Sequence, residues 1–474
     1  MLVRAPAVFV PWPRRVATVA FVAAGLVLGL AADASAGTVR LVTTGSGDNQ
    51  VSTLTFDDAA GERNDVLVQA TQTAVQVTDR AVAPVAGPGC RPSADPAMAV
   101  CPIAPDHPPL ILDIQGGGGD DVLTVPQPEE PEILDVLVGF ISGGDGHDTI
   151  TVTARDTSGL LLFMFVNGDG GDDRLVGGEG EDRLAGGAGK DTLVGAGNDD
   201  DLDGDGAGRT AEQFALALQD KPIKVAPPAA PADDVLDGGP GDDTADYAGR
   251  TQPLRVDLAD PAPDGSAGEA DRLTGIEDVD GGNGPNVLLG DAGSNSLDGS
   301  ARAPDVLDGR GGDDYLFGYG DDDTLLGGPG DDFLQRPGRG SSCGSGRDTL
   351  RGQRFAPAAL QPLRFGACEL ALSRGGIVSV KLTPVRLRAG VFTIHVTTSL
   401  PAGDNDDPVR FTIMTGSGRV AASRSVRIAG RRDRVQGLTL RLRGRAPSGS
   451  TVRLVMVEHG ITGRSLYVEL PLRG

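Results

Sequence analysis

Aspartate recurs at a fixed nine-residue spacing in the middle of this 474-residue chain. Residues 168–203 divide without gaps into the blocks GDGGDDRLV, GGEGEDRLA, GGAGKDTLV and GAGNDDDLD. Residues 309–335 divide likewise into GRGGDDYLF, GYGDDDTLL and GGPGDDFLQ. Every block has Asp at its sixth position and Leu at its eighth, and the sixth positions are Asp173, Asp182, Asp191, Asp200, Asp314, Asp323 and Asp332. Single blocks elsewhere place Asp121, Asp148 and Asp243 at the same position.

A carboxylate placed once per block predicts binding of a divalent cation. Residues 168–203 contain 11 acidic and 3 basic residues, so carboxylates brought together there would repel one another. A hard dication with oxygen ligands relieves this repulsion. Calcium suits such a site because it accepts six to eight oxygens, backbone carbonyls included, in flexible geometry. The sequence therefore predicts calcium as the cofactor.

The blocks also predict the elements that would position these carboxylates. A nine-residue unit with one obligate apolar residue cannot bury a core alone, whereas stacked units can, so the pattern predicts a solenoid. The last three residues of a block form a minimal strand with the eighth side chain inside, and the glycine-rich part turns the chain. Stacking then brings the carboxylates into rows, spaced by roughly 4.8 Å or a small multiple of it.

This pattern resembles the repeats-in-toxin, or haemolysin-type, calcium-binding family, whose nonapeptide is GGxGxDxUx with U apolar. The resemblance covers about half of the chain and implies a parallel β-roll in which the sixth-position Asp and turn carbonyls bind calcium between successive turns. It implies that the ten Asp residues named above are metal ligands, with Asp121, Asp148 and Asp243 the least certain because each stands alone. Asn286 and Asn295 replace Asp in two further blocks, which predicts turns that bind calcium weakly or are purely structural.

A competing calcium motif overlaps the fourth block. Asp199, Asp201 and Asp203, followed by Gly204, match the first half of an EF-hand loop. The twelfth position of that loop is Thr210, where an EF-hand carries Glu. The nonapeptide frame accounts for the same residues better.

Composition and motifs argue against several other functions. The net charge is −24, which is atypical of a nucleic-acid binder, and the excess of Gly and Asp is atypical of a helical enzyme. Only four His residues occur, none of them in an HExxH motif. The GxSxG match at residues 340–344 lacks the strand-before, helix-after context of a hydrolase. We therefore expect no enzyme; the alternative is an extracellular enzyme acting on polysaccharide, with the roll as an accessory domain.

The first 36 residues have the layout of a secretory signal peptide. Arginines at positions 4, 14 and 15 precede the apolar run 16–30, and Ala34-Ser35-Ala36 offers a cleavage site. We expect an extracellular protein that is either free or retained at the cell surface. We expect no transmembrane span after cleavage. Export fits the four cysteines, for which Cys90–Cys101 and Cys343–Cys368 are the simplest of three possible pairings.

The sequence predicts an all-β chain with a solenoid followed by a sandwich. Residues 37–115 read as a β-rich segment leading into the solenoid, and residues 116–351 as the calcium-binding roll. Insertions interrupt the roll at 204–232, which contains a short helix predicted at 210–218, and at 247–279. A linker with a disulfide cysteine at 352–375 leads to seven strand patterns in 376–474, typical of an immunoglobulin-like β-sandwich.

The C-terminal region reverses the charge of the chain. From Arg374 onward there are 17 Lys and Arg against 6 Asp and Glu, and six arginines fall within residues 431–445. Alternation predicts that Arg441, Arg443 and Arg445 share one strand face. That face is either simply solvated, or it binds an anionic cell-surface polymer or docks against the acidic solenoid. Nucleic acid is not expected because aromatic residues do not alternate with the arginines.

Overall fold

The computed structural model describes most of the chain between residues 37 and 351 and the strands that follow. The described residues are 37–44, 50–58, 61–71, 73–103, 110–126, 136–153, 163–208, 228–320, 322–335, 341–345, 348–351, 369–371, 379–382, 387–388, 391–400, 408–415, 420–427, 436–445, 451–458 and 465–471. They contain strands and no helix, so the predicted all-β class is confirmed, and none of them forms a helix able to cross a membrane. The predicted signal segment 1–36 and the predicted helix 210–218 lie outside the described residues.

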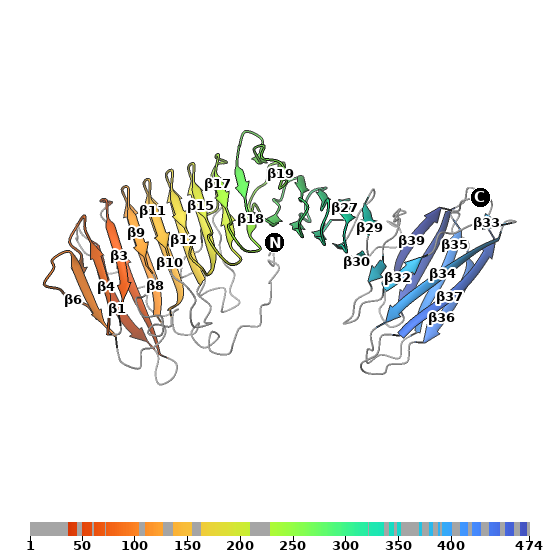
Figure 1. Ribbon diagram of the computed structural model, residues 1–474, viewed down its shortest axis with the longest axis horizontal. Coiled ribbons are helices and arrows are strands. Elements are labelled where there is room, and N and C mark those ends of the chain that lie inside the picture. The colour runs from red at the N-terminus through yellow and green to blue at the C-terminus, as the bar shows by residue number, and fades with distance from the viewer. Residues whose placement is uncertain are drawn as a thin grey trace. The chain divides into compact units, whose positions relative to one another are not determined.

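The chain divides into two compact units, Met1–Gly249 with Gly268–Ile276, and Arg250–Ala267 with Glu277–Gly474. The first unit contains two sheets whose strands lie side by side along the unit (Figure 1). The strands of one sheet, in spatial order, are β5 (Val85–Ala86), β1 (Thr38–Thr44), β2 (Val51–Asp57), β8 (Leu110–Gly118), β10 (Val136–Asp145), β12 (Phe163–Gly170), β14 (Glu181–Ala188), β16 (Asp201–Asp203) and β18 (Thr244–Asp246).

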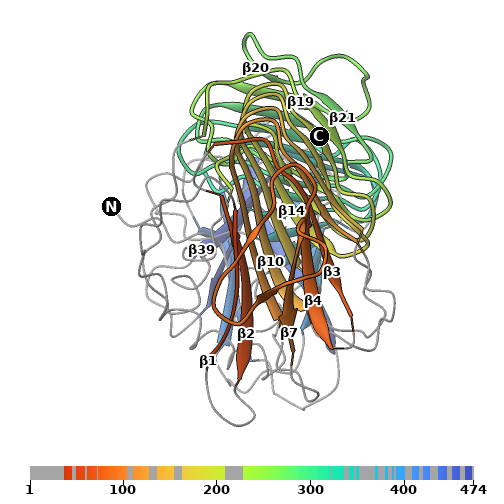
Figure 2. The ribbon, with the colours of Figure 1, turned by 90° about the vertical axis from the view of Figure 1, so that its left-hand side faces the viewer.

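The second sheet of this unit faces the first, as the end-on view in Figure 2 shows for β1 and β2 against β3, β4 and β7. Its strands, in spatial order, are β6 (Arg91–Pro92), β7 (Met98–Pro102), β4 (Ala74–Asp79), β3 (Asp65–Ala70), β9 (Val122–Val125), β11 (Thr149–Val152), β13 (Arg174–Val176), β15 (Thr192–Val194), β17 (Val235–Asp237) and β21 (Arg272–Thr274).

Two nonapeptides make one coil of this solenoid. Strand β12 pairs in parallel with β14, and β13 with β15, each in a register that joins residues one coil apart. Hydrogen bonds between equivalent positions of adjacent coils therefore span 18 residues where no insertion intervenes, and 43 residues across the insertion after β16. The predicted parallel β-roll is confirmed.

The N-terminal segment is the first coil of the same solenoid. Strand β2 pairs in parallel with β8, and β3 pairs in parallel with β9. Antiparallel hairpins at this end, β1 with β2 and β3 with β4, begin the two sheets. The solenoid thus begins before residue 116, because its first coil has strands but lacks the glycine-rich signature.

The second unit contains a second pair of sheets built in the same way. One sheet runs, in spatial order, through β20 (Gly265–Ser266), β19 (Leu254–Asp257), β23 (Asn286–Leu289), β25 (Val306–Asp308), β27 (Thr324–Pro329) and β29 (Ser342–Ser345). The other runs through β22 (Asp278–Asp280), β24 (Ser296–Asp298), β26 (Tyr315–Phe317), β28 (Phe333–Gln335), β30 (Thr349–Arg351) and β31 (Glu369–Ala371). Strand β31 pairs in parallel with β30, although it lies in the segment predicted as a linker.

The C-terminal region forms two antiparallel sheets of four strands each. One contains β32 (Ser379–Leu382), β33 (Leu387–Arg388), β34 (Val391–Leu400) and β37 (Gln436–Arg445). The other contains β35 (Pro408–Thr415), β36 (Val420–Arg427), β38 (Thr451–Glu458) and β39 (Ser465–Pro471). All seven predicted strands are present, with β33 in addition, and the immunoglobulin-like sandwich stays a prediction. Its arginine-bearing stretch lies in β37, which pairs with β34.

The core of each roll is a column of the eighth-position residues. These side chains are at most 1 % exposed: Leu123, Ile150, Leu175, Leu184, Leu193, Leu202, Leu236, Ala245, Leu288, Leu297, Leu307, Leu316, Leu325 and Leu334. Burial of one aliphatic side chain contributes roughly 1.5–3 kcal/mol. One such residue in every nine is therefore enough to fix which face of each short strand points inward.

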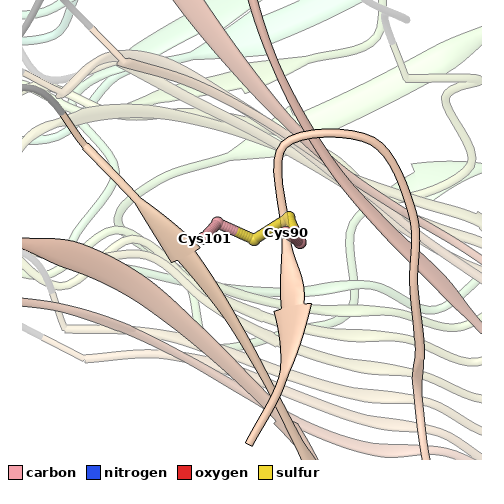
Figure 3. The surroundings of a disulfide bond; sticks show 2 residues. All are labelled: Cys90 and Cys101. Atoms are coloured by element: carbon pink, nitrogen blue, oxygen red, sulfur yellow. A yellow bond between two sulfur atoms is a disulfide. The ribbon is translucent and has the colours of Figure 1, made fainter.

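The predicted disulfide Cys90–Cys101 is present at the N-terminal end of the first unit (Figure 3). It joins the segment that leads into β6 to the buried end of β7. Cys343, in β29, is also disulfide-bonded, and Cys368, its predicted partner, lies outside the described residues.

Candidate metal centre

The sixth-position Asp residues point into the roll. Each lies two residues before the buried eighth-position side chain, and a spacing of two puts both on the same side of a strand. All ten predicted ligands are accordingly buried, with at most 3 % of each residue exposed. Four of them, for example, precede the strands β9, β11, β13 and β15 directly.

These residues form four hydrogen-bonded rows. In each row the backbone N–H of one sixth-position residue donates to Oδ1 of its counterpart in the next coil, at 2.6–3.2 Å. Row 1 contains Asn64, Asp121, Asp148, Asp173, Asp191, Asp234 and Asp271, and row 2 contains Asp182, Asp200 and Asp243. Row 3 contains Asn286, Asp305 and Asp323, and row 4 contains Asn295, Asp314, Asp332 and Asp348.

The second carboxylate oxygen divides the turns into two kinds. In the first kind, Oδ2 is buried and has no hydrogen-bond partner among the described residues. We call these open turns; they carry Asp121, Asp148, Asp173, Asp191, Asp200, Asp314 and Asp332. A buried oxygen without a partner is costly unless a donor or a cation satisfies it.

Closed turns satisfy the same position from within the protein. Oδ2 of Asp182 accepts the backbone N–H of Gly178 at 2.6 Å, and Oδ2 of Asp323 accepts that of Gly320 at 2.7 Å. Asp305 accepts the N–H of Ser300 in the same way, at 2.6 Å. These turns leave no carboxylate oxygen for a cation.

Asn residues close three further turns with an N–H donor. The side-chain amide of Asn286 donates to the Gly282 carbonyl at 2.9 Å and to Asp305 Oδ1 at 3.0 Å. The amide of Asn295 donates to the Glu277 carbonyl at 2.9 Å. Asn64 Nδ2 donates to Asp58 Oδ2 and to the Glu62 carbonyl, both at 2.9 Å. Each of these amides donates hydrogen bonds within its turn, and whether the turns of Asn286 and Asn295 bind calcium weakly or are purely structural stays a prediction.

Burial raises the pKa of the open-turn carboxyls. It raises the pKa of Asp121, Asp191 and Asp314 to about 7 and that of Asp200 to about 8. The hydrogen bond from the preceding coil lowers each pKa, but the charge of neighbouring Asp residues raises it further. Without a cation, the ionised carboxylates of a row therefore repel one another and destabilise the folded roll.

The first glycine of each block lets two oxygens of its surroundings approach the backbone closely. A Cβ on Gly168 would collide with both Asp173 Oδ2 and the Gly186 carbonyl oxygen. A Cβ on Gly186 would likewise collide with Asp191 Oδ2 and the Gly204 carbonyl oxygen. A carboxylate oxygen and a carbonyl oxygen from the next coil thus converge beside a residue that has no side chain.

The donor set fits calcium. Among the described residues, no three His, Cys, Asp or Glu side chains gather into one cluster, so each centre must combine its carboxylate with backbone carbonyls. Calcium accepts such all-oxygen, partly backbone coordination, whereas zinc takes nitrogen and sulfur ligands. The alternative EF-hand loop is not assembled: Asp199 Oδ1 accepts the Asp242 N–H, and Asp201 pairs with Arg183.

Comparison with known protein families agrees with this geometry. Residues 166–206, 231–247, 273–301 and 303–334 match the model of the RTX calcium-binding nonapeptide repeat. The middle of the chain carries RTX repeats. They are calcium-binding repeats, and the predicted cofactor is calcium. No curated protein matches the chain.

The RTX rows hold more residues than the sequence indicated. Asp234, Asp305 and Asp348 belong to partial blocks, but Asn64 and Asp271 were not expected. Asp271 lies in SAGEADRLT, a degenerate repeat inside the predicted insertion 247–279, and Tyr247 Oη donates to its Oδ2 at 2.9 Å. Asn64 lies in AAGERNDVL, two residues before the buried Val66. The sequence signal that could identify both row members is an Asp or Asn two residues before an apolar residue.

The structure also changes the ranking of the predicted ligands. Asp121 and Asp148 stand in isolated blocks, yet both lie in row 1 and both belong to open turns. Asp182 and Asp323 lie in regular blocks, yet both belong to closed turns. Asp243 joins row 2 by accepting the Asp200 N–H at 2.8 Å. That the ten Asp residues are ligands stays a prediction.

Proposed function

We propose that this is a secreted structural or adhesive repeat protein whose roll folds when it binds extracellular calcium. The observation that carries the proposal is the set of open turns, each with a buried carboxylate oxygen that has no hydrogen-bond partner in the described part of the chain. Calcium would satisfy these oxygens and cancel the repulsion along the rows. We further propose that the protein is not an enzyme.

The proposed mechanism couples metal binding to folding. A glycine-rich, acidic chain loses much conformational entropy on ordering and buries little apolar surface in return. Where calcium is scarce, as inside a cell, the roll would stay unfolded. At millimolar calcium, sites of the extracellular affinity class fill, and the free energy of binding becomes free energy of folding.

Calcium titration of the full chain tests this proposal. Far-UV circular dichroism and calorimetry would follow folding, with magnesium as the control ion. We expect β signal to appear with calcium, not with equal magnesium, and to disappear on chelation. A chain that is fully folded in chelator and indifferent to calcium would refute the folding mechanism.

The basic C-terminal region supports a partner of opposite charge. Its arginine-rich strand β37 suits an anionic cell-surface polymer, which would hold the protein on the cell. The full chain should then bind anionic polymer in calcium, with a salt dependence that Arg441→Ser and Arg443→Ser reduce. Salt-independent binding, or none, would count against this partner.

A further inference from the structure

Aromatic side chains gather on one face of the second unit. The chain has 13 Phe, 4 Tyr and 1 Trp, and four of these lie in an unbroken series of ring contacts on or beside β26 and β28. Ring centroids are 5.9 Å apart for Tyr315 and Phe333, 5.8 Å for Phe333 and Phe317, and 6.2 Å for Phe317 and Tyr319. Tyr315 is 54 % exposed, and the other three are half-buried.

Tyr319 holds a backbone conformation that disfavours its side chain. Its φ is 56°, in the left-handed region, at the second position of its repeat. The same position of the next repeat is Gly328, with φ 108°. Asp169, Ala196 and Arg310 hold the same position of their repeats at φ 71°, 92° and 63°, so the conformation belongs to the repeat, and a bulky side chain is accepted there at some cost in strain. Folding alone would favour glycine at position 319.

Carboxylates lie at the end of this aromatic series. Tyr319 Oη donates to Asp298 Oδ2 at 3.1 Å, and the register places Asp298 of β24 beside Phe317 of β26. Oδ1 of Asp298 is buried and has no hydrogen-bond partner within the described residues. In the next strand, β22, Asp280 pairs with Asp298. The face therefore combines flat apolar rings with hydrogen-bond acceptors.

We propose that this aromatic face, consisting of Tyr315, Phe317, Tyr319, Phe333 and Asp298, binds a neutral polysaccharide built of pyranose rings. The C–H face of a pyranose carries slight positive charge and stacks on the negative face of an aromatic ring. The hydroxyl of the exposed Tyr315 can exchange hydrogen bonds with the sugar hydroxyl groups, and Asp298 orients Tyr319 from below. Binding sites of small molecules commonly combine aromatic walls with a few polar groups in this way.

Charge and ring arrangement select this ligand over others. At this face an anionic polymer would be repelled by Asp298 and by Asp280. A quaternary ammonium is recognised by a cage of rings around it. Here the contacting rings lie side by side at interplanar angles of 24–50°, which gives a strip that suits an extended chain of sugar rings.

Affinity electrophoresis of the full chain in saturating calcium tests the proposal. The gels would contain neutral glucan, mannan or galactan, with alginate as the anionic comparison. We expect at least one neutral polymer to retard the protein, whereas any retardation by alginate would come from the basic C-terminal region and should not depend on Tyr315. Tyr315→Ala and Phe333→Ala should weaken retention at least fivefold, while the control Val306→Ala, an exposed residue of the other sheet at 37 %, should not.

Tyr319→Gly separates binding from a purely structural role. It removes the strain and the ring together, so the unfolding midpoint should stay within a few degrees while retention falls at least fivefold. Retention unchanged in this variant and in Tyr315→Ala would overturn the proposal, as would retardation by alginate alone or by none of the polymers. Circular dichroism in the same buffer shows whether the chain is folded, so these outcomes are independent of the proposed calcium switch.

Discussion

Open and closed turns differ in the hydrogen bonding of the second side-chain atom of the sixth residue, while their first glycines meet the same pair of oxygens. In the open turns of row 1, from Asp121 to Asp191, this atom is a buried oxygen that has no partner among the residues described. In the closed turns, it accepts a backbone N–H or is the amide nitrogen of an Asn. One atom of the sixth residue thus decides whether a turn requires a cation.

The position of the Asn turns adds to this comparison. Asn64, Asn286 and Asn295 are the first members of rows 1, 3 and 4, so three of the four rows begin with a turn in which a side-chain amide donates, although Asn64 Oδ1 is buried without a partner among the described residues. Asn64 Nδ2 has oxygens of Asp58, Glu62 and Gly116 within 3.1 Å, an arrangement that resembles coordination of a cation. We expect these first turns to hold without calcium and to support the open turns that follow.

The largest expected effect is that of pH on the metal-free chain, because it acts on all open turns at once. Burial raises their pKa values in the folded state from the ordinary 3.8 to about 7 for Asp191 and about 8 for Asp200. The folded chain then binds more protons than the unfolded one, so stability falls as pH rises from about 4 through these values. In chelator, the chain should therefore show less β signal by circular dichroism at pH 8 than at pH 5.

Calcium should reverse this pH dependence. Protons compete with the metal for the same carboxylates, so calcium affinity should be weaker at pH 5 than at pH 8. Circular dichroism with and without calcium at both pH values measures the two effects. A β signal in chelator that increases from pH 5 to pH 8 would contradict the assignment of the open turns.

The second prediction concerns the glycine beside an open turn. Gly168→Ala should prevent calcium binding at Asp173 and destabilise the roll by about 1–3 kcal/mol, because the added methyl group overlaps two oxygens. The matched control is Gly170→Ala in the same turn, where the nearest atom, Asp145 Oδ1, is 3.7 Å away. Equilibrium dialysis and denaturant unfolding measure both. Equal effects of the two substitutions would show that the space beside Gly168 is not a cation site.

The third prediction compares aspartates of the two kinds. Asp173→Asn places an amide where Oδ2 was and converts an open turn into a closed one, so at least one bound calcium should be lost. The calcium concentration at the folding midpoint should rise about tenfold, which is roughly 1.4 kcal/mol. Asp182→Asn should keep the number of bound ions, because its Oδ2 already accepts the Gly178 N–H. Loss of the same number of ions in both variants would remove the distinction.

The smallest expected effect is the conversion of a closed turn into an open one. Asn286→Asp replaces an amide donor with a carboxylate that faces Asp305 Oδ1, 3.0 Å from the present nitrogen. The variant should bind one more calcium ion, and at low calcium it should be less stable than the parent by about 1 kcal/mol. Ion counting by mass spectrometry under native conditions measures the gain. An unchanged count with an unchanged midpoint would argue that Asn286 does not replace a cation.

The repeat itself could be predicted from the sequence, and so could the column of buried leucines. Both depend on local spacing: Asp at position six and Leu at position eight share a strand face wherever the strand forms. The resemblance to RTX repeats added calcium, and the family comparison agrees. The first coil was not recognised as part of the solenoid, because β2 and β3 carry no glycine-rich block and join it only through pairing with β8 and β9.

The tertiary structure alone decided which carboxylates remain open. Asp182 and Asp191 stand at the same position of consecutive, regular blocks, yet Gly178 N–H satisfies one and no described residue satisfies Oδ2 of the other. The hydrogen bond to Asp271 Oδ2 is likewise not visible in the sequence, because its donor, Tyr247, lies 24 residues away. Sequence spacing fixes the side of the strand on which a carboxylate lies. The hydrogen bonds of its second oxygen depend on how adjacent coils are stacked, and that arrangement exists only in the folded roll.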